Sequence, residues 1–340
     1  MSLACILTGP LHLSVQEQSS AAPAAGQVLV QLGAGGICGS DLHYYQHGRA
    51  GAFAIRAPFV PGHEASGVVQ AVGEGVSRVQ VGQKVAINPA HPCGTCAACR
   101  QGRSNLCERM VFLGSAAIFP HIPGFFREEF VMAEGQLTPI DEDVSLGEIA
   151  CAEPLSVGLH AVHRAGDVLG ATVLVTGAGT IGCMCVIAAR LAGAARVIAS
   201  DPSERAQHMA LAVGADEVAA TVDDSANWSG RVDVAIEAAG HPAALASCLR
   251  AVRRGGRIVQ VGTLPAEMPF AANDIMTREL SYLGAFRADV EFDWAVQALR
   301  TRRADVRPLI SAQIPISQSK TAFDLALDRS RSTKVQLIPG

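Results

Sequence analysis

The sequence predicts an α/β protein made of two units: a barrel-like unit of short β-strands, and a doubly wound parallel sheet with helices on both faces. Three observations predict this fold class. Short apolar runs separated by glycines fill the first part of the chain, as in all-β units. From about residue 172, apolar runs alternate with helical stretches, which is typical of βαβ units. The 340 residues are also enough for two domains of ordinary size.

Composition and charge exclude several classes of function. Hydrophobic residues make up 49% of the chain and charged residues 17%, as in well-packed globular proteins. The net charge of −4 and the lack of a basic stretch argue against a nucleic-acid partner. No apolar run approaches the roughly 18–20 residues of a membrane span, and the first residues lack the pattern of an export signal. We therefore expect a cytoplasmic protein whose ten cysteines are reduced and able to bind metal.

The first unit is expected to begin with strands joined by turns. Residues 26–32 have the alternation of a half-buried strand, and the glycines at 33, 35 and 36 are expected to break it. The segment that starts at Cys38 should then open a short helix. Residues 67–73 and 81–87 predict two further strands, so short strands with glycines between them indicate the barrel-like unit.

Four cysteines follow in a single stretch, namely Cys93, Cys96, Cys99 and Cys107. Four thiols at this spacing, with the turn-forming Gly94 among them, match a tetrahedral all-sulfur zinc site. Such a zinc would be structural, because no ligand position is left to exchange. An iron–sulfur site and a redox pair are the alternatives, and the spacing favours structural zinc over both.

A second set of metal-binding residue types is spread more widely. Cys38 offers a thiol, His63 and Glu64 offer an imidazole and a carboxylate, and Glu153 offers a second carboxylate. This mixed set suits a catalytic zinc, where one position stays open for water or substrate. Taken alone, Cys38 would more often be a small buried hydrophobe, and Glu64 could be a surface carboxylate. The whole set predicts a catalytic zinc site.

A GxGxxG motif, Gly177 to Gly182, lies between an apolar run at 172–176 and an alanine-rich helical stretch that reaches about residue 191. The motif alone is a weak signal. Here a strand precedes it and a helix follows it, which is the context of a Rossmann dinucleotide site. Its glycines let the backbone approach a pyrophosphate, whose charge faces the helix N-terminus.

Asp201 strengthens this interpretation. It ends the expected strand 196–200 and lies nineteen residues past Gly182, the proper distance for a ribose-binding acid. A carboxylate at this position binds the adenosine ribose hydroxyls and repels a 2′-phosphate, so NAD is expected over NADP. Arg205 lies one turn further on and could soften that preference, although it is more readily explained as a solvated helix residue.

The alternation of strands and helices continues to about residue 289. Strands are expected at 232–236, 257–261 and 280–284, and a helix at 242–253. The strand ends near Gly262 and Ala285 should line the cofactor crevice. The tail predicts helices at 291–301 and 319–329 and strands at 314–316 and 334–338 that return to the first unit.

These motifs resemble those of the zinc-dependent medium-chain alcohol/polyol dehydrogenases almost end to end, and the Phe286-Arg287 pair resembles the polyol branch. The resemblance implies a GroES-like β-barrel catalytic domain at 1–150 and 290–340, with a structural zinc lobe at 91–108. It implies a Rossmann NAD-binding domain at 151–289. A homodimer or homotetramer is also implied.

The resemblance assigns roles to residues near the metal. Cys38 and His63 would hold the catalytic zinc, with Glu64 as a third ligand or exchanging with Glu153. The zinc would lower the pKa of the substrate hydroxyl and NAD would accept a hydride. Ser40 would take the proton and pass it through a ribose hydroxyl to His43 and solvent.

The resemblance also names the binding residues. The substrate would contact Tyr44, Glu153, Phe286 and Arg287. The residues expected to contact the cofactor are Gly177, Gly179, Thr180, Ile181, Gly182, Asp201, Arg205, Ala238, Val261, Gly262, Ala285 and Phe286.

Arg287 bears on the substrate class, because a guanidinium can bind a carboxylate through two hydrogen bonds. A sugar acid is therefore favoured, with a neutral polyol as the alternative. A non-catalytic dinucleotide-binding redox sensor is disfavoured by the presence of zinc ligands. An enzyme for formaldehyde or simple alcohols is disfavoured by the carboxylate that follows His63.

Overall fold

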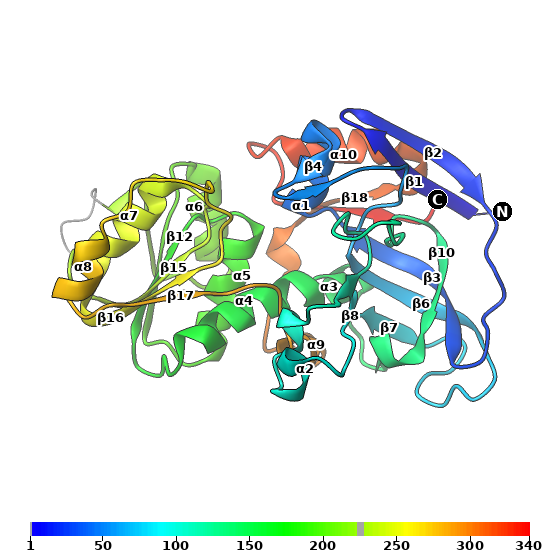
Figure 1. Ribbon diagram of the computed structural model, residues 1–340, viewed down its shortest axis with the longest axis horizontal. Coiled ribbons are helices and arrows are strands. Elements are labelled where there is room, and N and C mark those ends of the chain that lie inside the picture. Colours follow the sequence, from blue (N-terminus) through cyan, green and yellow to red (C-terminus); the bar gives the residue numbers. More distant parts are fainter. Residues whose placement is uncertain (1, 223–227) are drawn as a thin grey trace. The chain divides into compact units, whose positions relative to one another are not determined.

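The computed structural model describes residues 2–222 and 228–340, and the chain divides into two compact units (Figure 1). Unit 1 comprises Met1–Glu153, Val296–Thr301 and Ile310–Gly340, and unit 2 comprises Pro154–Ala295 and Arg302–Leu309. Among the described residues, no helix has both the length and the apolar character needed to cross a bilayer.

Unit 1 is organised around a largely antiparallel sheet whose order is β11-β7-β6-β3-β19-β18, with β10 paired to β3 (Figure 1). The C-terminal end of the chain thus completes a sheet that the N-terminal part begins, because β19 pairs with β3. The strands of this sheet are β3 (Gln27–Gly36), β6 (Glu64–Val72), β7 (Lys84–Ile87), β10 (Glu129–Ala133), β11 (Leu137–Ile140), β18 (Ile310–Pro315) and β19 (Lys334–Ile338). The other strands and helices of the unit are β1 (Ser2–Gly9), β2 (His12–Gln18), α1 (Gly39–His47), β4 (Arg49–Ala50), β5 (Phe53–Ala54), β8 (Ala90–His91), α2 (Ala97–Arg100), β9 (Val111–Phe112), α3 (Leu146–Ala150) and α10 (Ser319–Leu327).

The expectation that Gly33, Gly35 and Gly36 break the strand is wrong, because β3 runs on through Gly36. These glycines provide space for neighbouring side chains. A Cβ at Gly36 would lie 2.1 Å from a carboxylate oxygen of Glu64, and a Cβ at Gly33 would lie 2.6 Å from Leu146. The missing side chains thus allow Glu64 to be buried against β3.

Local sequence signals explain where the helices of unit 1 begin. Helix α1 starts after Cys38, and Asp41 in its first turn accepts a hydrogen bond from the Cys38 backbone N–H at 3.0 Å. Helix α3 begins with a capping box, in which Ser145 and Glu148 satisfy each other's backbone donors. Replacing such a cap typically costs about 1 kcal/mol, so both helix starts are well defined.

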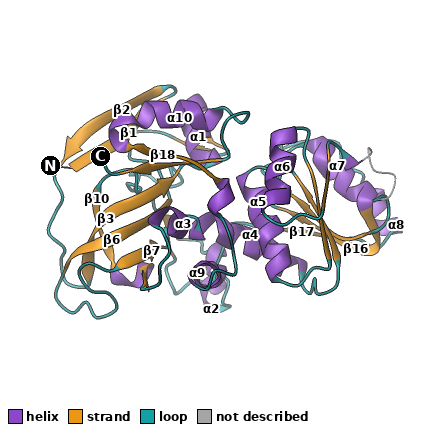
Figure 2. Ribbon diagram, turned by 180° about the vertical axis from the view of Figure 1, so that it is seen from behind, coloured by secondary structure: helices purple, strands orange, loops and turns teal. Residues whose placement is uncertain are grey.

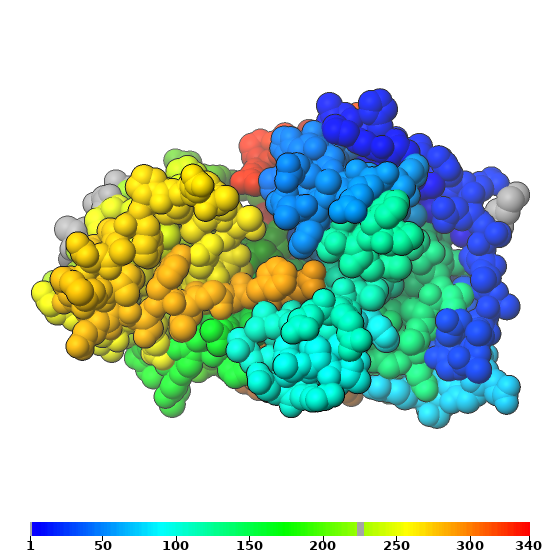
Figure 3. All heavy atoms as spheres, in the orientation of Figure 1, coloured from blue at the N-terminus to red at the C-terminus, as the bar shows by residue number. Residues whose placement is uncertain are grey.

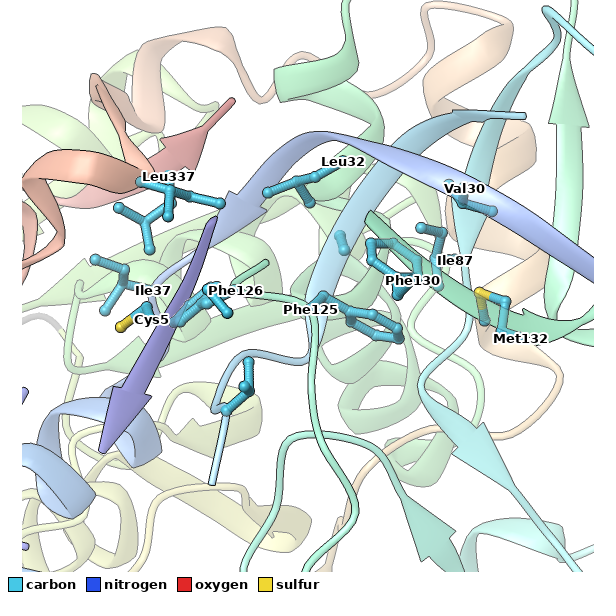
Figure 4. Close-up of a cluster of buried hydrophobic side chains, with 14 of the residues drawn as sticks. Cys5, Val30, Leu32, Ile37, Ile87, Phe125, Phe126, Phe130, Met132 and Leu337 are labelled. Atoms are coloured by element: carbon cyan, nitrogen blue, oxygen red, sulfur yellow. The ribbon is translucent and has the colours of Figure 1, made fainter. Parts of the chain in front are cut away.

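The core of unit 1 lies between the sheet and the segments that cover it. Figure 4 shows Phe125, Phe126 and Phe130 among aliphatic side chains that include Leu32 and Leu337. The Phe125 and Phe130 rings are 5.0 Å apart at their centroids, a distance typical of aromatic pairs. This core supports the strand ends that carry the metal-binding residue types.

Unit 2 is a parallel sheet with the order β14-β13-β12-β15-β16-β17, and helices α5 and α7 lie on opposite faces of it (Figure 2). The order reverses between β12 and β15, which is the point where dinucleotides bind in doubly wound sheets. Its elements are α4 (Ala152–Ala165) from Pro154 on, β12 (Thr172–Thr176), α5 (Thr180–Leu191), β13 (Arg196–Ser200), α6 (Glu204–Ala212), β14 (Glu217–Ala219), β15 (Val232–Glu237), α7 (Pro242–Ala251), β16 (Val252–Gln260), α8 (Ala272–Thr277), β17 (Ser281–Gly284) and the first part of α9 (Glu291–Arg300).

The predicted alternation of strands and helices in unit 2 is confirmed, and the largest shift of a boundary is at the start of β16. Helix α7 ends at Ala251, and β16 begins at Val252 rather than at 257. The register with β15 is irregular in between, since Val232 pairs with Val252 but Val234 pairs with Arg257. The strand thus contains a bulge, which an apolar pattern that begins only at 257 does not reveal.

Candidate functional site

Three metal-binding side chains converge at one end of the unit 1 sheet. Cys38 precedes α1, while His63 and Glu64 stand where β6 begins. Their ligand atoms all lie within 4.8 Å of one another. Gly62, with φ of 94°, supplies the left-handed backbone that turns the chain into β6. Sulfur, nitrogen and oxygen donors so close together fit a zinc ion, so the chemistry of the donor set agrees with the prediction.

A buried lysine holds Glu64 in this cluster. The Nζ atom of Lys334 on β19 lies 2.8 and 2.7 Å from the two carboxylate oxygens of Glu64. It also donates a hydrogen bond to the carbonyl of Ile37 at 3.0 Å. The side chains of Lys334 and Glu64 are only 2% and 1% exposed. Burial lowers the pKa of Lys334, but the charge and hydrogen bonds of Glu64, together with Cys38 and Cys151, raise it to about 12. Lys334 therefore carries a positive charge that neutralises Glu64.

Asp41 is buried beside the metal-binding residues and bonds the backbone next to them. One of its oxygens accepts the Cys38 backbone N–H, and the other accepts the Gly62 N–H at 3.2 Å. The Nδ1 atom of His63 lies 3.8 Å from the same carboxylate. The interpretation of Asp41 as a helix cap agrees with this geometry. The distance of 3.8 Å to His63 is longer than a hydrogen bond, so the hydrogen bonds of Asp41 hold the backbone at Cys38 and Gly62 on either side of the site.

Glu153 lies next to this cluster in the chain's first unit. Burial raises the pKa of Glu153 to about 7, with His63 opposing the rise and Glu64 adding to it. The charges of His63 and Glu64 therefore act on the Glu153 carboxyl group. Glu153 is not within the 4.8 Å group that Cys38, His63 and Glu64 form. Its part as an exchanging ligand stays a prediction.

Helix α1 carries the residues of the predicted proton path. Ser40 is partly buried in its first turn, and His43, three residues later on the same face, is exposed. Tyr44 is buried, and its hydroxyl accepts a hydrogen bond from the Ala116 backbone N–H at 3.1 Å. This placement gives Tyr44 a packing role, and its contact with substrate stays a prediction.

The four-cysteine lobe lies at the surface of unit 1, in cyan in Figure 3. The sulfur atoms of Cys93, Cys96, Cys99 and Cys107 all lie within 4.8 Å of one another, and Cys96 is 3.5 Å from Cys99. Zinc bonds of about 2.3 Å to sulfur require sulfurs roughly 3.8 Å apart, so the lobe fits the ion. Hydrogen bonds from the backbone of Thr95 and Cys96 lower the pKa of Cys93 to about 5, which favours the thiolate.

The glycine motif connects β12 to α5 through a tight turn. Gly177 has φ of 85°, and a Cβ at Gly182 would lie 1.7 Å from the Gly177 carbonyl oxygen. A Cβ at Gly179 would meet nothing within 4 Å, so open space faces the turn there. Thr180 and Ile181 follow in the first turn of α5, where backbone N–H groups are not used by the helix. This cradle fits a pyrophosphate.

Asp201 directly follows β13, beside the turn. Its carboxylate accepts the backbone N–H groups of Ala178 at 2.8 Å and Ser203 at 2.9 Å. Each carboxylate oxygen has further lone pairs for ribose hydroxyls. Arg205 is partly buried in the first turn of α6, which begins after the Ser203 cap.

The remaining cofactor candidates stand at the carboxyl ends of parallel strands. Ala238 follows β15, Val261 and Gly262 follow β16, and Ala285 follows β17. Phe286 is exposed, and the Arg287 guanidinium lies over its ring, with the guanidinium carbon 4.8 Å from the centroid. Arg287 has φ of 58°, a conformation that is uncommon for a residue with a side chain.

Lys334 is the functional residue that sequence reasoning missed. Nothing near it in the chain points to a metal site, and 270 residues separate it from Glu64. The only available signal is a lysine at the start of a strand that is otherwise apolar on alternate residues. The structure shows that β19 is buried almost throughout, which makes a charged residue there conspicuous.

Comparison with known families covers both parts of the chain. Residues 24–142 match the alcohol dehydrogenase GroES-like domain, and residues 180–301 match the zinc-binding dehydrogenase family. L-idonate 5-dehydrogenase (NAD(P)(+)) of Escherichia coli K12 is 39% identical over 98% of both chains. Sorbitol dehydrogenase of Bacillus subtilis is 36% identical over 92% of this chain and 90% of that protein.

Solved structures agree with these relatives. The crystal structure of L-idonate 5-dehydrogenase from E. coli superposes with a TM-score of 0.95 at 38% identity, covering 99% of this chain and 98% of that one. A zinc-binding dehydrogenase of Sinorhizobium meliloti bound to NADP gives a TM-score of 0.91 at 30% identity, covering 100% and 99%. The predicted GroES-like and Rossmann architecture is thereby confirmed. The chain belongs to the zinc-dependent medium-chain alcohol/polyol dehydrogenases, which are NAD(P)-linked oxidoreductases.

Proposed function

We propose that this enzyme oxidises a secondary hydroxyl of a sugar acid with NAD, converting L-idonate to 5-keto-D-gluconate. The observation that carries the proposal is the clustering of Cys38, His63 and Glu64 in a chain that also carries a dinucleotide turn. Similarity to L-idonate 5-dehydrogenases of E. coli, at 39% identity, and of Vitis vinifera, at 32%, supports the substrate.

Cys38 and His63, with Glu64 or Glu153, would hold the catalytic zinc, and the four-cysteine lobe would hold the structural one. When bound, the catalytic zinc lowers the pKa of a substrate hydroxyl, and NAD accepts the hydride. Asp41 holds the backbone at Cys38 and Gly62, and Lys334 limits the negative charge that Glu64 brings to the site. A carboxylate ligand makes this site harder than one of two cysteines and a histidine, which suits polyhydroxylated substrates.

The proton of the alcohol needs an acceptor and a route to water. Ser40 lies two residues after Cys38, and its hydroxyl can both accept and donate a proton. His43 is exposed on the same face of α1, and burial of part of its ring lowers its pKa, with His47 adding to the effect. A histidine that is neutral at physiological pH can accept the proton that Ser40 passes on.

Unit 2 would bind the cofactor through the turn from Gly177 to Gly182, Asp201 and the strand ends at Ala238, Gly262 and Ala285. Asp201 supports NAD over NADP, because a 2′-phosphate would meet its negative charge. Arg205 would weaken this preference; one relative is named for NAD(P)(+), and the structure from Sinorhizobium meliloti is bound to NADP. Initial rates with the two cofactors measure this preference.

Arg287 would bind the carboxylate of the sugar acid, with Phe286 beside it. The test is a screen of NAD reduction over L-idonate, D-gluconate, sorbitol, xylitol and L-threonine, followed by Arg287→Lys and Arg287→Ala. Both variants should raise KM for the aldonate more than for the polyols. Arg254→Ala, at an exposed arginine of β16, is the control and should leave both KM values unchanged. Equal losses on all substrates would mean that Arg287 does not recognise the carboxylate.

Sorbitol or xylitol dehydrogenase is the second candidate. It is favoured by the sorbitol dehydrogenases of B. subtilis, at 36% identity, and of Gallus gallus, at 33%. Faster turnover of sorbitol or xylitol than of L-idonate in the same screen would select it.

The proposal also covers the oligomeric state of the enzyme and its location in the cell. A homodimer or homotetramer formed through unit 2 is proposed from the family resemblance, and light scattering of the purified enzyme measures it. A cytoplasmic location is proposed because the lobe requires thiolates, and the cysteines of the described residues are free.

A further inference from the structure

Two histidines and a glutamate of unit 2 meet at a point that the proposed reaction does not use. His160 and His163 lie three residues apart on α4, and Glu291 is the first residue of α9. The Nδ1 atoms of His160 and His163 lie 3.1 and 2.5 Å from the same Oε1 atom of Glu291. The three donor atoms all lie within 4.8 Å of one another.

Exposure and orientation of these side chains suit a metal ion. The side chains of His160 and Glu291 are 9% and 2% exposed, whereas that of His163 is 56% exposed. An ion can therefore approach past His163 and keep water as a further ligand. The other oxygen of Glu291 accepts the Asp289 backbone N–H at 2.9 Å, which fixes the carboxylate. Such outer contacts orient the ligands in known metal sites.

Metal binding requires mainly that His163 moves away from Glu291. Bonds of about 2.0–2.1 Å from zinc to nitrogen and oxygen separate the ligand atoms by about 3.4 Å in a tetrahedral site. The His163 Nδ1 atom must therefore move from 2.5 Å to about 3.4 Å from Glu291 Oε1, an outward shift of roughly 0.9 Å that the exposure of His163 allows. Each imidazole would carry its proton on Nε2 and offer the Nδ1 lone pair to the ion.

We propose that His160, His163 and Glu291 bind a third divalent transition-metal ion, of the class that two imidazoles and one carboxylate select, such as Zn²⁺ or Ni²⁺. This site shares no residue with the two cysteine-containing sites. The ion would tie the end of α4 to the start of α9. The proposal does not depend on the substrate of the enzyme.

Trp294 provides a reporter for the ion. Its ring centroid lies 5.1 Å from that of His163, and the residue is 45% exposed. Trp228, the other tryptophan of the chain, is buried in the core of unit 2. A Ni²⁺ ion at the proposed site would therefore quench Trp294 more strongly than Trp228.

The experiment titrates Ni²⁺ into the zinc-loaded holoenzyme while tryptophan fluorescence is recorded. Saturable quenching is expected in the wild type, and His163→Ala should weaken Ni²⁺ binding by about tenfold or more. His208→Ala, at an exposed histidine of α6, is the matched control and should bind as the wild type does. Trp294→Phe should remove most of the quenching without removing the metal.

Metal analysis after dialysis against Zn²⁺ gives an independent readout. About three zinc ions per chain are expected in the wild type and in His208→Ala, and about two in His163→Ala. Because His163 is largely exposed, its variant should fold, and an unchanged melting temperature of the zinc-depleted protein checks this. Equal quenching and equal zinc content in wild type and His163→Ala would overturn the proposal and leave the cluster as a hydrogen-bonded contact.

Discussion

Replacing Lys334 by methionine is the most informative perturbation of the catalytic site. The lysine makes contacts of 2.7 and 2.8 Å with Glu64 and one of 3.0 Å with the Ile37 carbonyl, all buried. Lys334→Met keeps the length of the side chain but leaves the Glu64 carboxylate without its cation. Breaking a buried ion pair in this way costs about 3–5 kcal/mol. With an unfolding entropy of about 2.1 cal/mol/K per residue, 1 kcal/mol shifts the Tm of a 340-residue protein by roughly 1.4 °C, so the expected fall in Tm is roughly 4–7 °C.

Zinc should reduce this loss, because a bound cation next to Glu64 partly replaces the charge of Lys334. Thermal unfolding of wild type and Lys334→Met, each with zinc and after chelation, measures the effect. The difference in Tm between the two proteins should be larger after chelation.

Two further variants control the Lys334 experiment. Lys320→Met removes an exposed lysine that pairs with Asp324, and it should cost less than about 1 kcal/mol. The double variant Glu64→Gln/Lys334→Met removes both charges and should regain part of the stability that the single variant loses. A Lys334→Met protein as stable as Lys320→Met, or a double variant no better than the single one, would refute this account of Glu64.

Three other predictions concern the cofactor and the metals. Gly179→Ala should fold normally, but its Cβ would occupy the open space where the pyrophosphate is expected, so calorimetry should show weaker NAD binding. Gly182→Ala should instead lower Tm, because its Cβ would meet the Gly177 carbonyl oxygen. Asp201→Asn should lower the ratio of the initial rate with NAD to that with NADP. An unchanged ratio would contradict the role of Asp201 in selecting NAD. Cys96→Ser and Cys38→Ser should each lose about one zinc per chain. Cys38→Ser should abolish turnover and leave the four-cysteine lobe as resistant to limited proteolysis as in the wild type, whereas Cys96→Ser should make the lobe more sensitive to proteolysis.

Much of the fold could be predicted because its signals are local. The strands β12 and β13 match the predicted residues, and α5 ends at Leu191, where the alanine-rich stretch was expected to end. Buried parallel strands are continuous apolar runs, and the glycine turn after β12 marks its end. The bulge at the start of β16 lies in a polar, glycine-containing stretch, where periodicity carries no information.

The glycines of β3 show where local signals fail. Three glycines within four residues favour a turn when only neighbours in sequence are considered. In the folded chain, Gly33 faces Leu146 and Gly36 faces Glu64, so the reason for each glycine lies far away in sequence. The sequence alone contains no record of those contacts.

The candidate sites likewise divide into residues that local sequence motifs reveal and residues that only the fold brings together. Cys38, His63 and Glu64 belong to short motifs and could be recognised as possible ligands before the structure was known. Lys334 and the cluster of His160, His163 and Glu291 could not, because helices and strands distant in sequence bring these side chains together. Their charges and burial become visible only in the fold.

The proposed reaction requires that the metal held by Cys38 and His63 and the nicotinamide of NAD act on the same hydroxyl. A crystal structure of the enzyme loaded with zinc and NAD tests this most directly. The account predicts zinc bound by Cys38 and His63, with the nicotinamide C4 within hydride-transfer reach of a hydroxyl bound at the metal. A nicotinamide ring remote from those two residues, or no metal there under saturating zinc, would contradict it.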